Sequence, residues 1–206
     1  MPVISDQYLP LDGIVFNQFI RDHFGVKQAM RPRESAVKEY SGLDLPFQKR
    51  NMNEPDWYYA CSFAVWSPDT MRDKIEYAKR FDMAEAERYV DFDGKRNVVN
   101  TQRGQYKNYF VREYTFNAPY VDWYCRAEKS KLETLLHFCT HIGKKSSQGM
   151  GSVLRWEVSE TARDWYKNDN AGRVMRALPS KSGNVLYGIR PSYWLPRHQT
   201  MCIMPE

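Results

Sequence analysis

The chain has 206 residues, of which 42% are hydrophobic and 27% charged, and its formal net charge is +5. This length fits one domain, and the composition is that of a soluble globular protein. No apolar run approaches the roughly 18 to 20 residues that a membrane-spanning helix needs. The N-terminus lacks the basic and apolar regions of a signal peptide, so we expect a cytoplasmic protein.

The four cysteines are scattered and include no CxxC pair; they are Cys61, Cys125, Cys139 and Cys202. A structural zinc site needs closely spaced ligands, and a cytosolic chain of this size rarely contains a disulfide framework. We therefore expect four reduced cysteines, mostly in the core, and neither a metal nor a cofactor.

The first predicted elements are a short strand within residues 2–8 and a helix over 11–25. Asp12 can serve as the N-cap of this helix, an apolar stripe follows its length, and a glycine ends it. Residues 26–55 are predicted to form a long loop. The segment 56–66, DWYYACSFAVW, is aromatic and β-branched enough for a buried strand.

The middle of the chain is predicted to contain an insert and an arm. Residues 67–91 begin with Ser67 as N-cap and Pro68 at the first helical position, so we expect a helical insert. This insert is rich in acids, with seven of the chain's 25 Asp and Glu residues. Residues 95–117 are predicted to form a basic, extended β-hairpin or a flexible arm, with a turn near Arg103 and Gly104.

The remaining elements complete a recognisable order. Residues 120–128 alternate as a strand, 130–143 read as a helix, and 152–160 read as a further strand. A variable segment, 160–206, ends the chain. The order β-α-β-insert-β-α-loop-β is typical of an α+β, ferredoxin-like (RRM-like) domain, here a single domain over 1–206, with four strands and two helices on one face.

Charges are distributed unevenly along the chain. Lys95–Arg112 contains five basic residues and no acid, and Gly172–Arg197 contains the same. Eight acids lie between Asp69 and Asp93. This segregation predicts a polyanion-binding face opposite an acidic face, although ordinary solvated faces give the same pattern.

The segment HIGKKSSQGMGSV, residues 141–153, combines three glycines, two lysines and three serines. A P-loop requires a strand, GxxxxGK[ST] and then a helix, whereas here a helix precedes and a strand follows. The dinucleotide fingerprint GxGxxG is excluded because Leu154 stands at its last position. Two interpretations remain: a loop that holds successive phosphates, and a flexible turn.

Four segments resemble one protein family: YLPLDGIVFNQF, GQYKNYFVREYTF, IGKKSSQGMGSVLRWEV and YGIRPSYWLP. The third resembles the glycine-rich loop of the RAMP superfamily of CRISPR RNA-binding proteins. The four in this order resemble the type IV CRISPR effector subunit that caps the 5′ handle of the CRISPR RNA. This chain begins almost inside the strand that members have before PLDG, so the resemblance implies either a shortened start or an unusually short first strand.

The resemblance implies a non-catalytic, prokaryotic protein that binds the 5′ handle and closes a filament of backbone subunits. Its other partners would be the large subunit and target DNA near the protospacer-adjacent motif. The implied RNA-binding residues of the loop are Gly143, Lys144, Lys145, Ser146, Ser147, Gln148, Gly149 and Gly151. Those of the thumb-like arm are Lys95, Arg96, Arg103, Tyr106, Lys107, Tyr109 and Arg112, with Tyr106 and Tyr109 placed to stack on bases.

Two alternatives remain open. A related RAMP branch consists of endonucleases that cut the CRISPR repeat, for which His23 is the nearest catalytic candidate, and His137 and His141 lie one helical turn apart. The second alternative is a non-CRISPR, RRM-like RNA-binding assembly protein. Two features are compatible with each of these functions. The acidic insert is either a docking surface for the large subunit or a solvated segment. Tyr193 and Trp194 either fill the core or contact RNA or a partner.

Overall fold

The computed structural model describes residues 2–25, 44–89 and 99–205. The chain divides into two compact units. Unit 1 consists of residues 1–71 and 116–206, and unit 2 consists of residues 72–115. Each candidate site described below lies within one of these units.

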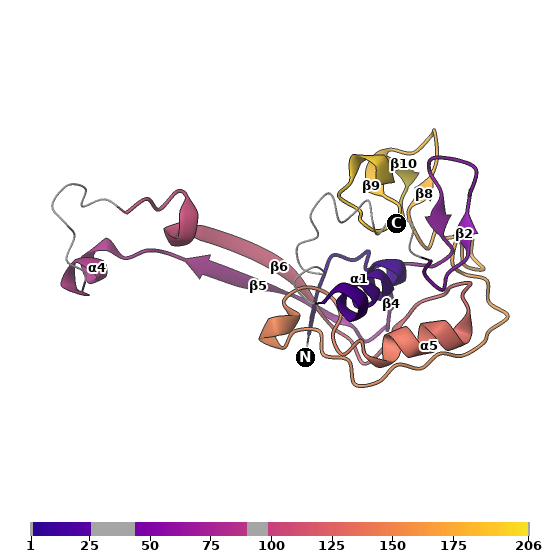
Figure 1. The fold of residues 1–206 in the computed structure, drawn as a ribbon, viewed down its shortest axis with the longest axis horizontal. Coiled ribbons are helices and arrows are strands. Elements are labelled where there is room, and N and C mark those ends of the chain that lie inside the picture. Colours follow the sequence, from indigo (N-terminus) through magenta and orange to yellow (C-terminus); the bar gives the residue numbers. More distant parts are fainter. Residues whose placement is uncertain (1, 26–43, 90–98, 206) are drawn as a thin grey trace. The chain divides into compact units, whose positions relative to one another are not determined.

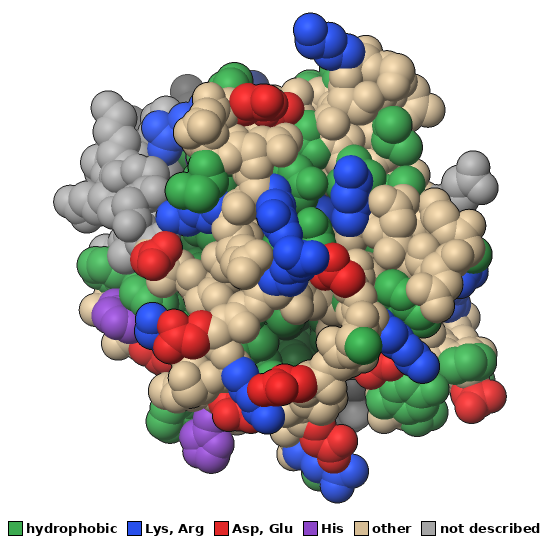
Figure 2. All heavy atoms as spheres, turned by 90° about the vertical axis from the view of Figure 1, so that its right-hand side faces the viewer, with side chains coloured by type: hydrophobic (Ala, Val, Ile, Leu, Met, Phe, Trp, Pro, Cys, Tyr) green, Lys and Arg blue, Asp and Glu red, His purple; other side chains and the backbone are tan. Residues whose placement is uncertain are grey.

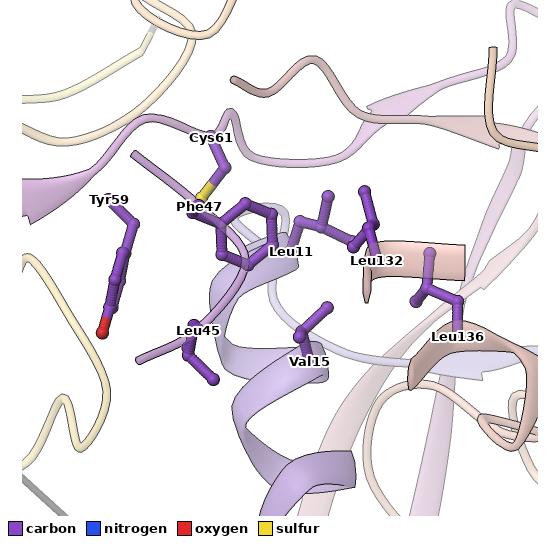
Figure 3. Packing of buried hydrophobic residues seen from close by; sticks show 8 residues of the cluster. All are labelled: Leu11, Val15, Leu45, Phe47, Tyr59, Cys61, Leu132 and Leu136. Carbon is purple, nitrogen blue, oxygen red and sulfur yellow. The ribbon is translucent and has the colours of Figure 1, made fainter. Parts of the chain in front are cut away.

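Two helices and a central segment build the main core of unit 1. Helix α1 spans Leu11–Phe24, and helix α5 spans Lys129–His137. Figure 3 shows how apolar side chains of both helices meet those of the segment between Leu45 and Cys61. The eight buried members of this cluster are Leu11, Val15, Leu45, Phe47, Tyr59, Cys61, Leu132 and Leu136.

Short antiparallel pairs surround this core. Strand β2 (Lys49–Arg50) pairs with β3 (Tyr58–Tyr59), and β4 (Val65–Trp66) pairs with β7 (Val121–Asp122). Near the C-terminus β8 (Leu178–Pro179), β10 (Gln199–Ile203) and β9 (Val185–Gly188) form a sheet in that order. Buried Cys202 of β10 joins a second apolar cluster, which also contains Tyr58, Ala60, Phe63, Tyr166, Ala177 and Ile189.

Unit 2 is built on a β-ribbon. Strand β5 (Met71–Lys79) and strand β6 (Tyr109–Asn117) run side by side, and helix α4 (Met83–Tyr89) follows β5 (Figure 1). In the strand order, β6 lies between β5 and β1 (Val3–Ile4). Nearly every residue of the ribbon in unit 2 is exposed or half-exposed, so this unit has little apolar core.

The α+β class is confirmed, with few helices and several small antiparallel sheets. Helix α1 also matches its predicted range, and Gly25 caps its C-terminus. The first strand is short, with two residues. No helix in the described ranges is long and apolar enough to cross a membrane.

The prediction of a helical insert over 67–91 is wrong for the first half of that range. Residues 71–79 form a strand because their side chains pair with β6: Glu76 binds Arg112, and Lys74 lies over the ring of Tyr114. Ser67 is not an N-cap; its carbonyl accepts the Thr70 amide at 3.0 Å in a turn. Residues 95–98 of the arm lie outside the described residues; in the described part, 99–117, β6 pairs with β5 and not with another strand of the arm.

Three further expectations differ from the structure. Asp12 does not cap α1; Pro10 is the N-cap, and the Asp12 side chain is buried. The helix expected over 130–143 ends at His137, because the following residues pair with 151–153 instead. Residues 152–160 form no strand; Ser152 makes one isolated β-bridge, to His141. The Trp156 side chain is held by a hydrogen bond instead, in which its indole Nε1 donates to the Cys139 carbonyl at 2.7 Å.

Candidate nucleic-acid interface

The glycine-rich loop is anchored at both ends to the N-terminal residues of unit 1, in and beside β1. The Lys144 amide donates to the Ile4 carbonyl at 2.8 Å, and the Gly151 amide donates to the Pro2 carbonyl at 2.8 Å. The two ends also join each other, because the Ile142 amide donates to the Gly151 carbonyl at 2.9 Å. These bonds fix the base of the loop, residues 143–151, on the N-terminal segment.

Two loop glycines are required by close packing at positive φ. A side chain at Gly143, where φ is 77°, would place its Cβ 2.5 Å from the Ile4 carbonyl oxygen. At Gly151, where φ is 68°, a Cβ would overlap the Ile142 carbonyl. Gly149 also has positive φ, at 79°, but no atom lies within 4 Å of its Cβ position. Gly149 therefore leaves space beside the backbone.

The tip of the loop is polar and accessible. Residues Ser146–Gln148 form a 3-10 turn, closed by the Gln148 amide on the Lys145 carbonyl at 2.9 Å. Lys144, Ser147 and Gln148 are exposed, whereas Lys145 and Ser146 are half-buried. Lys145 itself has a φ of 60°, a left-handed conformation that costs a non-glycine residue roughly 1 to 2 kcal/mol. The loop thus brings two lysines and two hydroxyls to one short turn.

The described arm residues lie together in unit 2, around the start of β6. A 3-10 turn, Gly104–Tyr106, precedes the strand, and the Asn108 amide donates to the Thr101 carbonyl at 2.8 Å. Arg103, Tyr106, Lys107, Tyr109 and Arg112 are all exposed. Lys95 and Arg96, also predicted as RNA-binding residues, lie outside the described residues.

The arm is not purely basic in space. Arg112 Nε donates to Glu76 Oε1 at 2.7 Å, which joins the basic segment to the acidic one. In unit 2, therefore, acids and bases interleave instead of forming opposite faces. Figure 2 shows the same mixture on the face it presents, where Lys and Arg side chains stand beside Asp and Glu side chains.

The second basic run, Gly172–Arg197, supplies two of its five arginines and lysines to the interior. Arg176 is 3% exposed, and its guanidinium donates to the carbonyls of Cys61 and Ile189, each at 2.8 Å. Arg190 is 6% exposed and donates to the Trp57 carbonyl at 2.7 Å. Neither arginine is available to a polyanion, so they stabilise the fold of unit 1.

The first and last of the four motif segments meet at a buried carboxyl. The hydroxyl of Tyr193 donates to Asp12 Oδ1, and the Gly13 amide donates to the same oxygen at 3.0 Å. Burial raises the pKa of Asp12, although the charge of Arg176 and the Tyr193 hydrogen bond oppose this. These segments thus have a structural role in this fold. Trp194, by contrast, is 57% exposed.

The histidines proposed for catalysis have local structural contacts. His23 Nδ1 lies 2.9 Å from the Phe19 carbonyl, and its ring stacks on the Phe19 ring at 3.9 Å. His137 ends α5, whereas His141 lies beyond it and contacts the Thr140 hydroxyl at 2.9 Å. The expectation that His137 and His141 share one helix is therefore wrong. Within the described ranges, no three His, Cys, Asp or Glu residues gather as metal ligands would.

Residues 36–205 match the model of a protein family described as CRISPR type IV associated protein Csf3. The chain belongs to this family. The matched range includes the glycine-rich loop, the arm and the YGIRPSYWLP segment, and it confirms the resemblance to a type IV CRISPR subunit. A search of curated proteins finds no match. For this Csf3-family chain, the loop of unit 1 and the arm of unit 2 are therefore each interpreted in the context of a CRISPR system.

Proposed function

We propose that this chain is a non-catalytic, RNA-binding subunit of a type IV CRISPR effector complex, with a RAMP fold of the RRM-like type. It binds the 5′ handle of the CRISPR RNA, caps the filament of backbone subunits and helps to position target DNA near the protospacer-adjacent motif. The chain works in the prokaryotic cytoplasm without a cofactor. The Csf3 family supports its place in a type IV system.

The observation that supports RNA binding most directly is the loop 143–151. Its base is fixed by hydrogen bonds to β1, while its tip presents Lys144, Lys145, Ser146 and Ser147. No acid lies between Thr134 and Trp156. Lysine is a flexible point charge that suits successive phosphates, and serine hydroxyls and backbone amides are common partners of phosphate and sugar oxygens.

Handle recognition requires unpaired nucleotides, because the deep groove of A-form RNA hides base edges from side chains. The arm supplies exposed aromatic rings for such bases. Tyr106 is 43% exposed and Tyr109 is 47% exposed. Tyr106 is held in place by the ring of Phe81, whose centroid lies 5.1 Å away. We therefore assign phosphate binding to the loop and base contacts to the arm.

The double variant Lys144→Ala/Lys145→Ala tests this assignment. If the two lysines neutralise two handle phosphates, the slope of log affinity against log salt should flatten by about 1.4, at roughly 0.7 per phosphate of a single strand. The matched control is Lys129→Ala/Lys167→Ala, two exposed lysines of unit 1 outside the loop. A slope that changes equally in both double variants would exclude a specific role for the loop.

Cleavage is followed in the same samples. We expect the repeat RNA to remain intact, in wild type and in His23→Ala alike, because His23 is engaged by Phe19. Specific cleavage that disappears in His23→Ala would instead identify a repeat endonuclease.

A further inference from the structure

One face of the β5–β6 ribbon presents two exposed aromatic rings, each with a cation over it. Phe110 is 57% exposed and Tyr114 is 58% exposed. The guanidinium of Arg112 lies 5.2 Å from the Phe110 ring centroid, and Lys74 Nζ lies 5.5 Å from that of Tyr114. Neither ring was among the residues that the sequence suggested for binding.

Two contacts between the strands place these side chains on the same side of the ribbon. Residues two apart on a strand project to one face. Arg112 of β6 contacts Glu76 of β5, and Tyr114 contacts Lys74, so each strand contributes an alternating set to this face. Phe110 continues the series on β6. Tyr109, by the same alternation, belongs to the opposite face.

The two rings are not needed for the core. The three hydrophobic clusters found in the described residues include neither Phe110 nor Tyr114. The residue that continues the series on β5 is Ala78, which is exposed and too small to cover a neighbouring ring. Large apolar side chains gathered on an accessible face are typical of an interaction site.

The chemistry of this face favours a ligand with flat rings and negative charge. Bases of single-stranded nucleic acid stack on aromatic side chains, while arginine and lysine bind the backbone between them. Phe110 and Tyr114 are four residues apart, about 13 Å along a strand, so each ring is available to a separate base. Arg112 lies between them in the series, where the sugar-phosphate backbone between two non-adjacent stacked bases would pass.

We propose that this face binds unpaired single-stranded nucleic acid, with bases stacked on Phe110 and Tyr114 and phosphates bound by Arg112 and Lys74. The proposal rests on the proposed function, which makes RNA a ligand of the chain, and adds a second binding surface to it. Glu76 orients Arg112 through an exposed ion pair, and such pairs are weak enough for a phosphate to replace.

Photo-crosslinking tests the proposal in the full-length chain and in the assembled effector complex. The probes are a handle RNA with 5-iodouridine and a single-stranded DNA of the same sequence with 5-iododeoxyuridine, which distinguish the two sources of unpaired bases. We expect crosslinks to Phe110 or Tyr114. Phe110→Leu/Tyr114→Leu should weaken binding of at least one probe by roughly fivefold or more, the loss of one stacked base.

Matched variants separate stacking from other roles. Phe110→Tyr/Tyr114→Phe keeps both rings and should bind as wild type does, whereas Tyr89→Ala removes an exposed ring of α4 and should have no effect. Glu76→Gln removes the negative charge beside Arg112 and should tighten nucleic-acid binding. A variant that only disturbed packing would not bind more tightly.

Three results would overturn the proposal. Crosslinks elsewhere, with wild-type affinity in the leucine pair and the Lys144→Ala/Lys145→Ala effect intact, would reject this face and leave the proposed function standing. Loss of co-purification with the other effector subunits in Phe110→Ala/Tyr114→Ala, but normal nucleic-acid binding, would make the face a protein contact. Absence of any nucleic-acid binding by the complex would reject both proposals.

Discussion

Asp12 shows how a single side chain joins distant parts of unit 1. It lies in the first turn of α1, is fully buried, and accepts hydrogen bonds from Tyr193 near the C-terminus and from the amide of Gly13. Burial disfavours the charged carboxylate, and this effect exceeds the opposing influence of Arg176, so the pKa of Asp12 is raised from its ordinary 3.8.

The raised pKa of Asp12 predicts a pH-dependent stability. Because the folded state holds the proton more tightly than the unfolded chain, the contribution of Asp12 is complete below pH 3.8 and is lost as the pH rises through the higher, folded-state pKa. Urea unfolding of wild type and Asp12→Asn across this pH range should show wild type losing free energy of unfolding relative to the variant. A difference that stays constant with pH would contradict the assigned environment.

Lys145 combines backbone strain with a charge at the tip of the loop. Its φ of 60° lies in the left-handed region, which glycine adopts without penalty. Lys145→Gly should therefore leave the free energy of unfolding unchanged or raise it by up to about 1 kcal/mol, while RNA affinity falls. Chemical unfolding and handle-RNA binding measure the two effects. Reduced stability with unchanged affinity would show that Lys145 is a structural residue only.

At the scale of elements, the glycines of the loop divide by what surrounds them. Gly143→Ala and Gly151→Ala would push a Cβ into the carbonyls of Ile4 and Ile142, whereas Gly149→Ala meets open space. The first two should each destabilise unit 1 by more than Gly149→Ala, which costs roughly 1 to 2 kcal/mol for its positive φ. Urea unfolding of the three variants checks this order, and equal losses would mean that the loop does not pack on β1 as described.

Local signals predicted some elements well. The apolar stripe and the terminal glycine of α1 gave its range almost to the residue. The ribbon was missed because β5, with the sequence MRDKIEYAK, is exposed on both faces and has no strict apolar alternation. Its strand conformation depends on pairing with β6, about forty residues later, and helix propensity within the segment gives no sign of such a partner.

At the scale of the whole molecule, the sequence located the candidate site better than it described its electrostatics. The loop 143–151 was recognised from its glycines, lysines and serines, and the structure fixes its base on β1. The basic runs were misleading for two reasons. Arg176 and Arg190 turn inward to bind carbonyls, and Arg112 pairs with Glu76 across the ribbon. Burial and cross-strand pairing are not visible in a count of charges.

The division into two units predicts unequal local stability. Unit 1 contains the buried clusters, whereas β5 and β6 have few buried side chains. Amide hydrogens of residues 72–79 and 109–115 should therefore exchange faster than those of α1 and α5 in hydrogen-exchange mass spectrometry. Addition of single-stranded RNA should slow exchange in the ribbon if its aromatic face binds bases. If amide exchange in the RNA-free ribbon were as slow as in α1, this division would be contradicted.

The measurement that tests the account most directly is the binding of handle RNA and of a scrambled RNA of equal length across a salt series, with cleavage followed in the same samples. Using the assembled effector complex keeps any groove that needs neighbouring subunits intact. The account predicts a preference for the handle, affinity that falls as salt rises, a flatter slope in Lys144→Ala/Lys145→Ala, and intact RNA. Equal affinity for both RNAs, with no effect of the lysine pair, would contradict it.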